Sequence, residues 1–298
     1  MAELKHRGLG KLWLVIGLFL APALIFYTLF LIVPLIGTLL LSLTHWNGYN
    51  FAMIKFAGLA NFKAAAADPV FWQALSHNLY FLAGALIVNV GVALFFALAL
   101  DQKLPLTNLF RGIYLMPAVI SLVVTGVVFN LVLSPSLGLI NPFLTLIGLE
   151  EWAGEWLGNP SRVLPVLVFI NCWQGFGLSM FLFIARLVAI PEDLHEAAFV
   201  DGANRFQDIW YVTLPMLKNT VAVVTLLEAI NSLKTFSIIY VMTKGGPNHK
   251  SEVLSSWGYF QAFTANKVGY GSAILVVLLL LTFMLAYVHV TRFQSREE

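Results

Sequence analysis

Charged residues are scarce in this chain. Of its 298 residues, 11% are Asp, Glu, Lys or Arg and 59% are hydrophobic, whereas an ordinary soluble domain is about 25% charged. Such a composition argues against a water-soluble globular protein, and it is too apolar for a disordered one. The formal net charge of +2 is too small to indicate a nucleic-acid-binding surface. These deficits indicate an integral membrane protein.

Cysteine and catalytic motifs are also lacking. The single cysteine, Cys172, excludes an intrachain disulfide framework and a thiolate-cluster metal site. The sequence contains no phosphate-binding loop, no H-E-x-x-H, no G-x-S-x-G and no dinucleotide fingerprint. Its six histidines are scattered without metal-ligand spacing. We therefore assign no catalytic residue and no metal site, and we expect a chain that is not an enzyme and binds no cofactor itself.

Six apolar stretches are each long enough to cross a bilayer, whose core of roughly 30 Å needs about 20 helical residues. They are residues 12–43, 78–100, 112–133, 163–185, 220–243 and 269–290. Glu228 and Lys234 are the only charged residues inside them, as the cost of charge in hydrocarbon requires. No strand-like alternation is present. The sequence predicts an all-α polytopic membrane protein in which residues 1–298 form one domain with six transmembrane helices.

The distribution of basic residues predicts the orientation of these helices. With both termini inside, the cytoplasmic segments carry about twice the density of Lys and Arg found in the outer loops, as the positive-inside rule requires. These inner basic residues are Lys5, Arg7, Lys11, Lys103, Arg111, Arg186, Arg205, Lys218, Arg292 and Arg296. We therefore expect both termini to be cytoplasmic.

The first stretch is longer than an upright crossing needs. It must tilt, bend at Pro22 or Pro34, or project beyond the bilayer. Residues 21–23 loosely resemble a signal-peptide cleavage site. Because some 20 largely apolar residues follow that point, an uncleaved anchor is the favoured interpretation.

The longest cytoplasmic segment, the loop 186–219, has the pattern of a helical turn. Pro191 suits a first helical position, and the acidic residues after it favour a helix N-terminus. The pattern predicts a short helix over 192–200 that ends near Gly202, where backbone freedom permits a turn.

A second short helix is predicted to follow in the same loop. Asn204 and Gln207 have the spacing of an N-terminal cap, and the helix is expected to stop by Pro215. Three alanines, at 197, 198 and 203, keep the surface small enough for another protein to approach closely. The alternative is an amphipathic turn at the membrane surface.

This loop carries a motif with a family resemblance. Glu196-Ala197-Ala198, Gly202 and Leu214-Pro215 together resemble the EAA loop of permease subunits of binding-protein-dependent ABC importers, with Val212 where the family usually has Ile. The Asp201-Gly202-Ala203 variant resembles the carbohydrate branch. Further similarity to that branch lies in Gly58–Phe62, Asp68–Trp72, the Thr243-x-Gly245-Gly246-Pro247 segment, Tyr259–Phe263 and Gly269–Ala273.

The resemblance implies a type I importer in a bacterial inner membrane. Two permease subunits form the pathway, two ATPase subunits dock below them with ATP and Mg, and a periplasmic solute-binding protein delivers the solute. The EAA loop forms the coupling helix that contacts the ATPase. The coupling residues that this implies are Glu196, Ala197, Ala198, Asp201, Gly202, Ala203, Leu214 and Pro215.

Polar residues within the spans suggest a pathway for a solute. Glu228, Asn231, Ser232 and Thr235 share one helical face, and the fourth span adds Asn171, Gln174 and Ser179. Amides and hydroxyls can bind a sugar, and Trp173 or Phe176 could cover its C–H surface. The predicted pathway residues are Asn171, Gln174, Glu228, Asn231, Ser232 and Thr235.

A structural role for these side chains remains an alternative, because amides in membrane helices also hold helices together. We favour that role for Asn89. For the Glu228 face both roles remain open, since an intramembrane carboxylate is costly without water or a partner.

The sequence thus predicts the permease subunit of an ATP-driven sugar or oligosaccharide importer that works by alternating access. Alternatives are the import of a polyol, a glycerol phosphate or an acidic sugar derivative by the same class. Two other classes agree less well with the sequence. A secondary transporter would leave the loop 196–215 without a role. A membrane-embedded enzyme would need a convergent catalytic pair, which the sequence does not show.

Overall fold

The computed structural model describes residues 16–100 and 107–294 of the chain. The first four residues of the stretch 12–43 lie outside the described residues. The same holds for some of the basic residues on which the predicted orientation depends, namely Lys5, Arg7, Lys11, Lys103 and Arg296.

The described chain is helical almost throughout. A helix runs from residue 16 through a π-helical turn, Thr28–Ile32, into α2. The first half of the chain contains α2 (Val33–Ser42), α3 (Ala60–Ala67), α4 (Pro69–Ala85), α5 (Ala93–Leu100), α6 (Thr107–Val119), α7 (Leu122–Val132) and α8 (Ile140–Leu146). The second half contains α9 (Val163–Val188), α10 (Glu192–Val200), α11 (Arg205–Asp208), α12 (Leu214–Leu233), α13 (Ser237–Met242), α14 (Leu254–Tyr259) and α15 (Val268–Gln294). A two-residue antiparallel pair, β1 (Thr44–His45) and β2 (Lys55–Phe56), aligns Thr44 with Phe56 and His45 with Lys55.

Five helices are long and apolar enough to cross a membrane, and a sixth span results when a bent pair is counted as one. The five are Ile16–Ser42, Pro69–Leu100, Val163–Val188, Arg205–Met242 and Val268–Phe293. The predicted all-α polytopic fold is confirmed. The second helix begins nine residues earlier than predicted because Pro69 opens it and the Asp68 carboxylate caps it, accepting from the Val70 N–H at 2.9 Å.

The predicted third span is not one straight helix. Helices α6 and α7 meet at an angle of 101°. Pro117 lies inside α6, two residues before its end, and it removes a helical hydrogen bond. Ser121, with φ −58° and ψ 136°, departs from helical geometry and precedes α7. The apolar composition gave no sign of this break.

The expectation that a helix stops by Pro215 was wrong. Residues 205–242 count as one helical span, with a π-helical turn, Ile209–Thr213, that ends two residues before the proline. Pro215 is the second residue of α12, which continues directly from this π-helical turn. The same arrangement occurs where the π-helical turn Thr28–Ile32 precedes Pro34.

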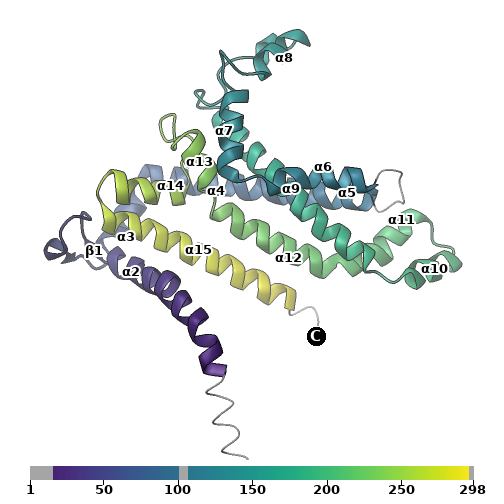
Figure 1. Ribbon diagram of the computed structural model, residues 1–298, viewed down its shortest axis with the longest axis horizontal. Helices are drawn as coiled ribbons and strands as arrows, with labels where there is room; N and C mark the ends of the chain where they lie inside the picture. Colours follow the sequence, from purple (N-terminus) through teal and green to yellow (C-terminus); the bar gives the residue numbers. More distant parts are fainter. Residues whose placement is uncertain (1–15, 101–106, 295–298) are drawn as a thin grey trace, which may run out of the picture.

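Figure 1 shows an elongated body in which α9, α12 and α15 run along the long axis. Helices α10 and α11 lie at one end, and β1 and α3 lie at the other. Helix α9 packs against α5, α6 and α12, and α2 packs on α15. Helices α7 and α8 project from the body (Figure 1).

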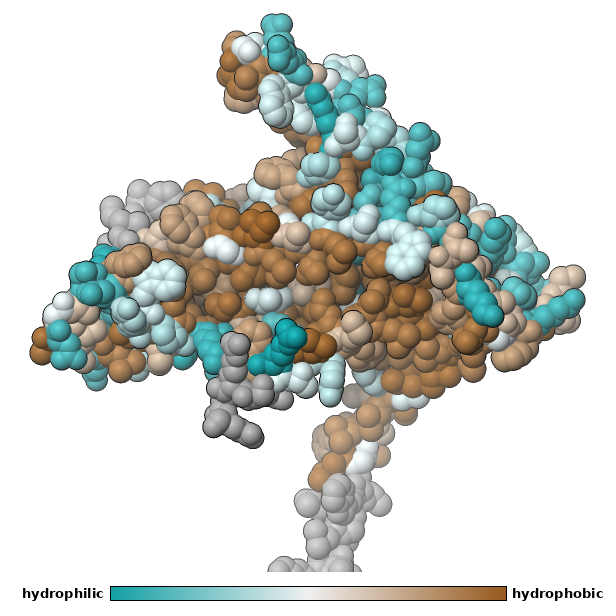
Figure 2. Space-filling view, turned by 180° about the vertical axis from the view of Figure 1, so that it is seen from behind, coloured by the Kyte–Doolittle hydropathy of each residue, from teal (hydrophilic) through white to brown (hydrophobic). Residues whose placement is uncertain are grey.

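Apolar side chains form three buried clusters along the body. One joins α4, α9 and α13 through Phe81, Leu167 and Ile238. The others lie around Met180, Phe183 and Leu217, and around Phe71, Leu254 and Ile274. Figure 2 shows a broad hydrophobic band over the middle of one face, with hydrophilic residues toward the two ends and on the projecting arm. This is the surface that a bilayer would cover.

The segment between α13 and α14 folds tightly around a buried carboxylate. Glu252 is 2% exposed, accepts a hydrogen bond from the Ser256 hydroxyl, and lies 3.7 Å from His249 Nδ1. Gly245 has φ +87°, and a Cβ there would overlap the Glu252 carboxylate. The Gly246–Pro247 peptide is cis. Gly245 is thus required in the Thr243-x-Gly245-Gly246-Pro247 segment for two reasons: its φ is positive, and a side chain there would overlap the Glu252 carboxylate.

Burial raises the pKa of the Glu252 carboxyl above its ordinary value, and hydrogen bonding to Ser256 and the nearby His249 oppose this shift only in part. The folded chain therefore holds this proton more tightly than the unfolded chain, so stability falls as the pH rises from about 4.5 toward the raised value. We expect Glu252→Gln to raise the melting temperature at pH 8 by about 2 °C and to flatten its fall between pH 5 and pH 8. Thermal unfolding of the purified complex measures this.

Glu151→Gln is the matched control, because Glu151 is exposed. It should leave the pH profile unchanged. If the melting temperature of Glu252→Gln changes with pH in parallel with that of the native protein, the raised pKa of Glu252 is contradicted.

Candidate substrate pathway and coupling loop

A polar pocket of about 360 Å³ lies in the middle of the body, among α9, α12, the bend between α6 and α7, and the π-helical segment Leu86–Val92. Its lining includes Asn89, Asn171, Gln174, Gly175, Glu228, Asn231, Lys234, Thr235 and Phe236. Five of the six predicted pathway residues therefore meet in one pocket, although they come from α9, α12 and the break that follows α12.

Glu228 is the centre of the hydrogen bonding at this pocket. It is 8% exposed. One carboxylate oxygen accepts from Asn89 Nδ2 at 2.8 Å, and the other accepts from the Ser179 hydroxyl at 2.8 Å. These two bonds tie α12 to α9 and to the π-helical segment. The structural role favoured for Asn89 agrees with this contact, and Glu228 both lines the pocket and links helices.

Gly175 makes this contact possible. A Cβ at this position would lie 2.5 Å from Asn89 Nδ2 and 3.8 Å from Glu228 Oε2. A side chain on Gly175 would therefore displace Asn89 from Glu228. The sequence reasoning missed this residue, because a glycine in an apolar span carries no signal without a partner across the interface.

Gln174 has a second function at the bend of the third span. Its Nε2 donates to the Ile120 carbonyl at 2.7 Å, and Ile120 lies in the two-residue break between α6 and α7. A carbonyl freed by a broken helix needs such a donor at membrane depth. Gln174 thus stabilises the bend that forms one wall of the pocket.

Ser232 is the predicted pathway residue that does not line the pocket. It is 1% exposed, and its hydroxyl donates to the Glu228 carbonyl at 2.7 Å within the helix. Ser232 lies four residues after Glu228 and therefore near the same face of α12. Helix α4 covers Ser232, because Asn78 Nδ2 on α4 donates to the Ser232 and Leu233 carbonyls. Lys234 lines the pocket instead, because α12 ends at Leu233.

The aromatic side chain at the pocket is Phe236 rather than Trp173 or Phe176. Trp173 packs edge-on against Phe129 with centroids 5.3 Å apart, and Phe176 packs against Phe96 and Tyr114. Phe236 lies in the break after α12, which helical periodicity did not indicate. Across residues 16–100 and 107–294, no three His, Cys, Asp or Glu side chains gather as metal ligands would.

The first part of the loop 186–219 has the predicted local structure. Helix α10 spans Glu192–Val200, and Gly202 follows it with φ +84°. The Ala203 N–H bonds the Ala198 carbonyl at 2.9 Å, and the Gly202 N–H bonds the Phe199 carbonyl at 3.1 Å. These two bonds are the Schellman motif, which favours glycine at this position. Asn204 and Gln207 form a reciprocal capping box at the start of α11.

Two side-chain contacts fix the loop relative to the spans. His195 Nδ1 on α10 lies 2.8 Å from Asp208 Oδ1 on α11, and Arg186 Nε at the end of α9 donates to the Met216 carbonyl in α12. The spacing rules used for the sequence do not reach such contacts, because His195 and Asp208 are brought together by the turn at Gly202.

The end of the molecule formed by α10 and α11 exposes large apolar side chains. Among them Phe199 is 53% exposed, Phe206 69% and Tyr211 79%. Helix α10 buries none of its nine residues. Of the predicted coupling residues, Glu196, Ala197, Asp201 and Gly202 are exposed, and Ala198 and Ala203 are partly covered. Leu214 and Pro215 lie at the start of α12, away from this turn. Phe199 lies outside the membrane spans, and Phe206 and Tyr211 lie in the first turns of the span 205–242. Large exposed apolar side chains gathered at one end of a molecule are typical of a protein interface.

Cysteine substitution tests which side chains face the polar pocket. We expect cysteines at 231 and 234 to react quickly with a small water-soluble thiol reagent, and cysteines at 229 and 232 to react at least tenfold more slowly, because Asn231 and Lys234 are exposed while Ala229 and Ser232 are buried. The native Cys172 is buried, so background labelling is low. Fast labelling at 232 with none at 231 would show that the pocket-facing side of α12 has been assigned wrongly.

Comparisons with known proteins identify the family. The family described as "Binding-protein-dependent transport system inner membrane component" matches residues 89–296. The probable ABC transporter permease protein YurN of Bacillus subtilis is 35% identical over 283 residues, which is 94% of this chain and 96% of YurN. The trehalose/maltose transport system permease protein MalF of Thermococcus litoralis is 32% identical over 98% of this chain and 97% of its own.

A solved structure has the same fold. A crystal structure of a bacterial ABC transporter involved in the import of the acidic polysaccharide alginate contains a chain that superposes with a TM-score of 0.83 at 23% identity, covering 98% of each chain. The resemblance inferred from the EAA loop is confirmed. The chain belongs to the family of binding-protein-dependent transport system inner membrane components, and it is a transport subunit of the ABC transporter permease type.

Proposed function

We propose that this chain is one of two permease subunits in an ATP-driven importer that takes up a sugar or oligosaccharide across a bacterial inner membrane. A periplasmic binding protein supplies the solute, and two ATPase subunits bind ATP and Mg. The observation that carries the proposal is the pairing of a polar pocket at mid-body with an exposed, Gly202-capped helix at one end of the same spans.

The pocket has the chemistry that a sugar needs. Asn171, Gln174 and Asn231 supply amides, Glu228 and Lys234 supply charge, and Phe236 supplies an aromatic surface. Planar amides and one aromatic face are typical of small polar-ligand sites. At 360 Å³ the pocket holds a short saccharide, and a second permease subunit would close its open side.

The coupling loop has the chemistry of a docking surface. Glu196 and Asp201 are exposed beside Phe199 and Val200, and the loop joins α9 directly to the helix that carries Glu228. A rigid-body movement of α10 would thus reach the pocket through α9 and α12. Alternating access driven from the ATPases requires a connection of this kind.

Purification of the intact complex tests the proposal. Affinity purification through this chain should recover one further permease and an ATPase, and a cognate binding protein with its sugar should stimulate ATP hydrolysis severalfold. A panel of sugars, polyols, glycerol phosphates and acidic sugars identifies the solute. Recovery of the chain without any ATPase, or hydrolysis that no binding protein stimulates, would contradict the proposal.

A further inference from the structure

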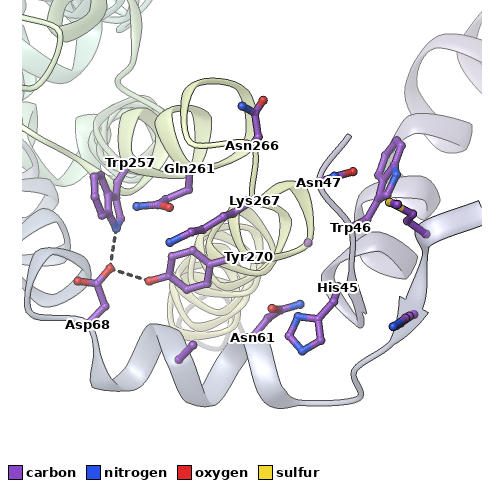
Figure 3. Close-up of a pocket in the computed structure, with 14 residues that line it drawn as sticks. His45, Trp46, Asn47, Asn61, Asp68, Trp257, Gln261, Asn266, Lys267 and Tyr270 are labelled. Carbon is purple, nitrogen blue, oxygen red and sulfur yellow. Dashed lines mark hydrogen bonds between the residues drawn. The ribbon is translucent and has the colours of Figure 1, made fainter. Parts of the chain in front are cut away.

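A second and larger pocket lies at the opposite end of the body from α10 and α11. Its volume is about 910 Å³, and it lies between the β1–β2 hairpin, α3, α14 and the start of α15 (Figure 3). Apart from Gly269 and Tyr270 in the first turn of α15, its lining residues lie outside the membrane spans. The pocket is therefore separate from the polar pocket at mid-body.

One wall of this pocket holds a buried acceptor without a donor. Gln261 is 7% exposed, and its Oε1 atom is buried with no hydrogen-bond partner in the described structure. Figure 3 shows Gln261 among Trp257, Lys267 and Tyr270. A buried amide oxygen without a donor is unfavourable, so a ligand hydroxyl that donates to this atom would form a hydrogen bond that the protein itself does not supply.

The charge of the lining is positive. Lys55 and Lys267 line the pocket, and both are exposed and make no ion pair in the part of the chain that the structure describes. Asp68 is the one carboxylate in the lining. It already accepts from the Trp257 indole N–H at 2.9 Å, the Tyr270 hydroxyl at 2.6 Å and the Val70 N–H. Its charge is thus stabilised within the wall, and Lys267 lies beside Gln261 and Tyr270 in the same wall (Figure 3).

Two indole rings complete the wall. The Trp46 N–H donates to the Asn50 carbonyl, so what this residue offers a ligand is aromatic surface. Trp257 is 6% exposed, stacks on Phe260 and donates to Asp68, so it supports the wall from behind. An aromatic face, an amide acceptor and two lysines match a molecule with C–H surface, hydroxyls and one negative charge.

We propose that this pocket is a binding site for an acidic saccharide, with the carboxylate of a uronic acid at Lys267 and a sugar hydroxyl donating to Gln261 Oε1. The site is distinct from the mid-body pathway and does not depend on transport. A lipid phosphoglycerol headgroup also combines anion and hydroxyls, but the lining outside the spans favours a ligand from the aqueous phase.

Binding to the purified complex in nanodiscs of zwitterionic lipid tests the site. The probes are D-galacturonate and its disaccharide, with glucose and cellobiose as neutral counterparts, and the readouts are titration calorimetry and tryptophan fluorescence. We expect saturable binding of the acids only. Lys267→Gln should weaken it about tenfold, the loss that one charge-assisted hydrogen bond produces, and Gln261→Met should also weaken it.

Lys63→Gln is the matched control, because Lys63 lies on α3 and is exposed but does not line the pocket. It should leave affinity unchanged. Lys55→Gln provides a second variant if Lys267→Gln alters the elution of the complex. Equal affinity for neutral sugars, no saturable acid binding, or equal losses in Lys267→Gln and Lys63→Gln would overturn the proposal. So would acid binding that phosphatidylglycerol nanodiscs abolish, which would assign the pocket to a lipid headgroup. None of these results would affect the proposed transport function.

Discussion

Gly202→Val is expected to reduce ATP-driven uptake at least about tenfold while the complex still assembles in the membrane. The residue has φ +84°, and a Cβ there would meet no other atom within 4 Å. The penalty therefore comes from the backbone alone. It is about 1–2 kcal/mol for an ordinary side chain and larger for a β-branched one. Relief of that strain would unwind the Schellman turn and shift α10 relative to α11.

Gly202→Asn is the matched control, because asparagine tolerates a left-handed conformation. It should retain most of the uptake. Uptake and binding-protein-stimulated ATP hydrolysis are measured in parallel for both variants. Native uptake by Gly202→Val would show that the turn does not contribute to coupling, and equal loss in both variants would point to side-chain volume rather than to conformation.

Glu228→Ala is expected to destabilise the complex by about 1–3 kcal/mol, because two interhelical hydrogen bonds are lost and Asn89 Nδ2 and the Ser179 hydroxyl lose their acceptor. Asn89 already has one unpartnered atom, Oδ1. Thermal unfolding of Glu228→Ala, Asn89→Ala and the double variant should give a coupling energy of about 1 kcal/mol.

Thr235→Val is the control for this cycle. Thr235 lines the same pocket, but its hydroxyl donates only to the Asn231 carbonyl, four residues earlier in the chain, at 3.2 Å. Its replacement should change stability by less than about 0.5 kcal/mol. A coupling energy near zero between Glu228 and Asn89 would show that the carboxylate serves the pathway alone.

Local patterns predicted those parts of the molecule that depend on neighbouring residues. Helix α10 has the predicted bounds, because Pro191 and Gly202 act on their own backbone. The Asn204–Gln207 capping box follows from a three-residue spacing. The apolar stretches located the spans because the hydrocarbon core of a bilayer excludes charge at every position along a helix.

Breaks and interhelical contacts could not be predicted in this way. The 101° bend between α6 and α7 depends on the Gln174 side chain of another helix reaching the Ile120 carbonyl. The continuation of the helix through Pro215 depends on a π-helical turn that has no simple sequence pattern. The burial of Ser232 depends on α4, which a helical wheel of α12 does not represent.

The most direct test of this account is uptake by proteoliposomes that contain the purified complex, with ATP and Mg inside and the binding protein and labelled sugar outside. We expect accumulation that requires both ATP and the binding protein and that Gly202→Val nearly abolishes. Uptake that proceeds equally without ATP or without the binding protein would contradict the account, because the coupling loop would then have no role in transport.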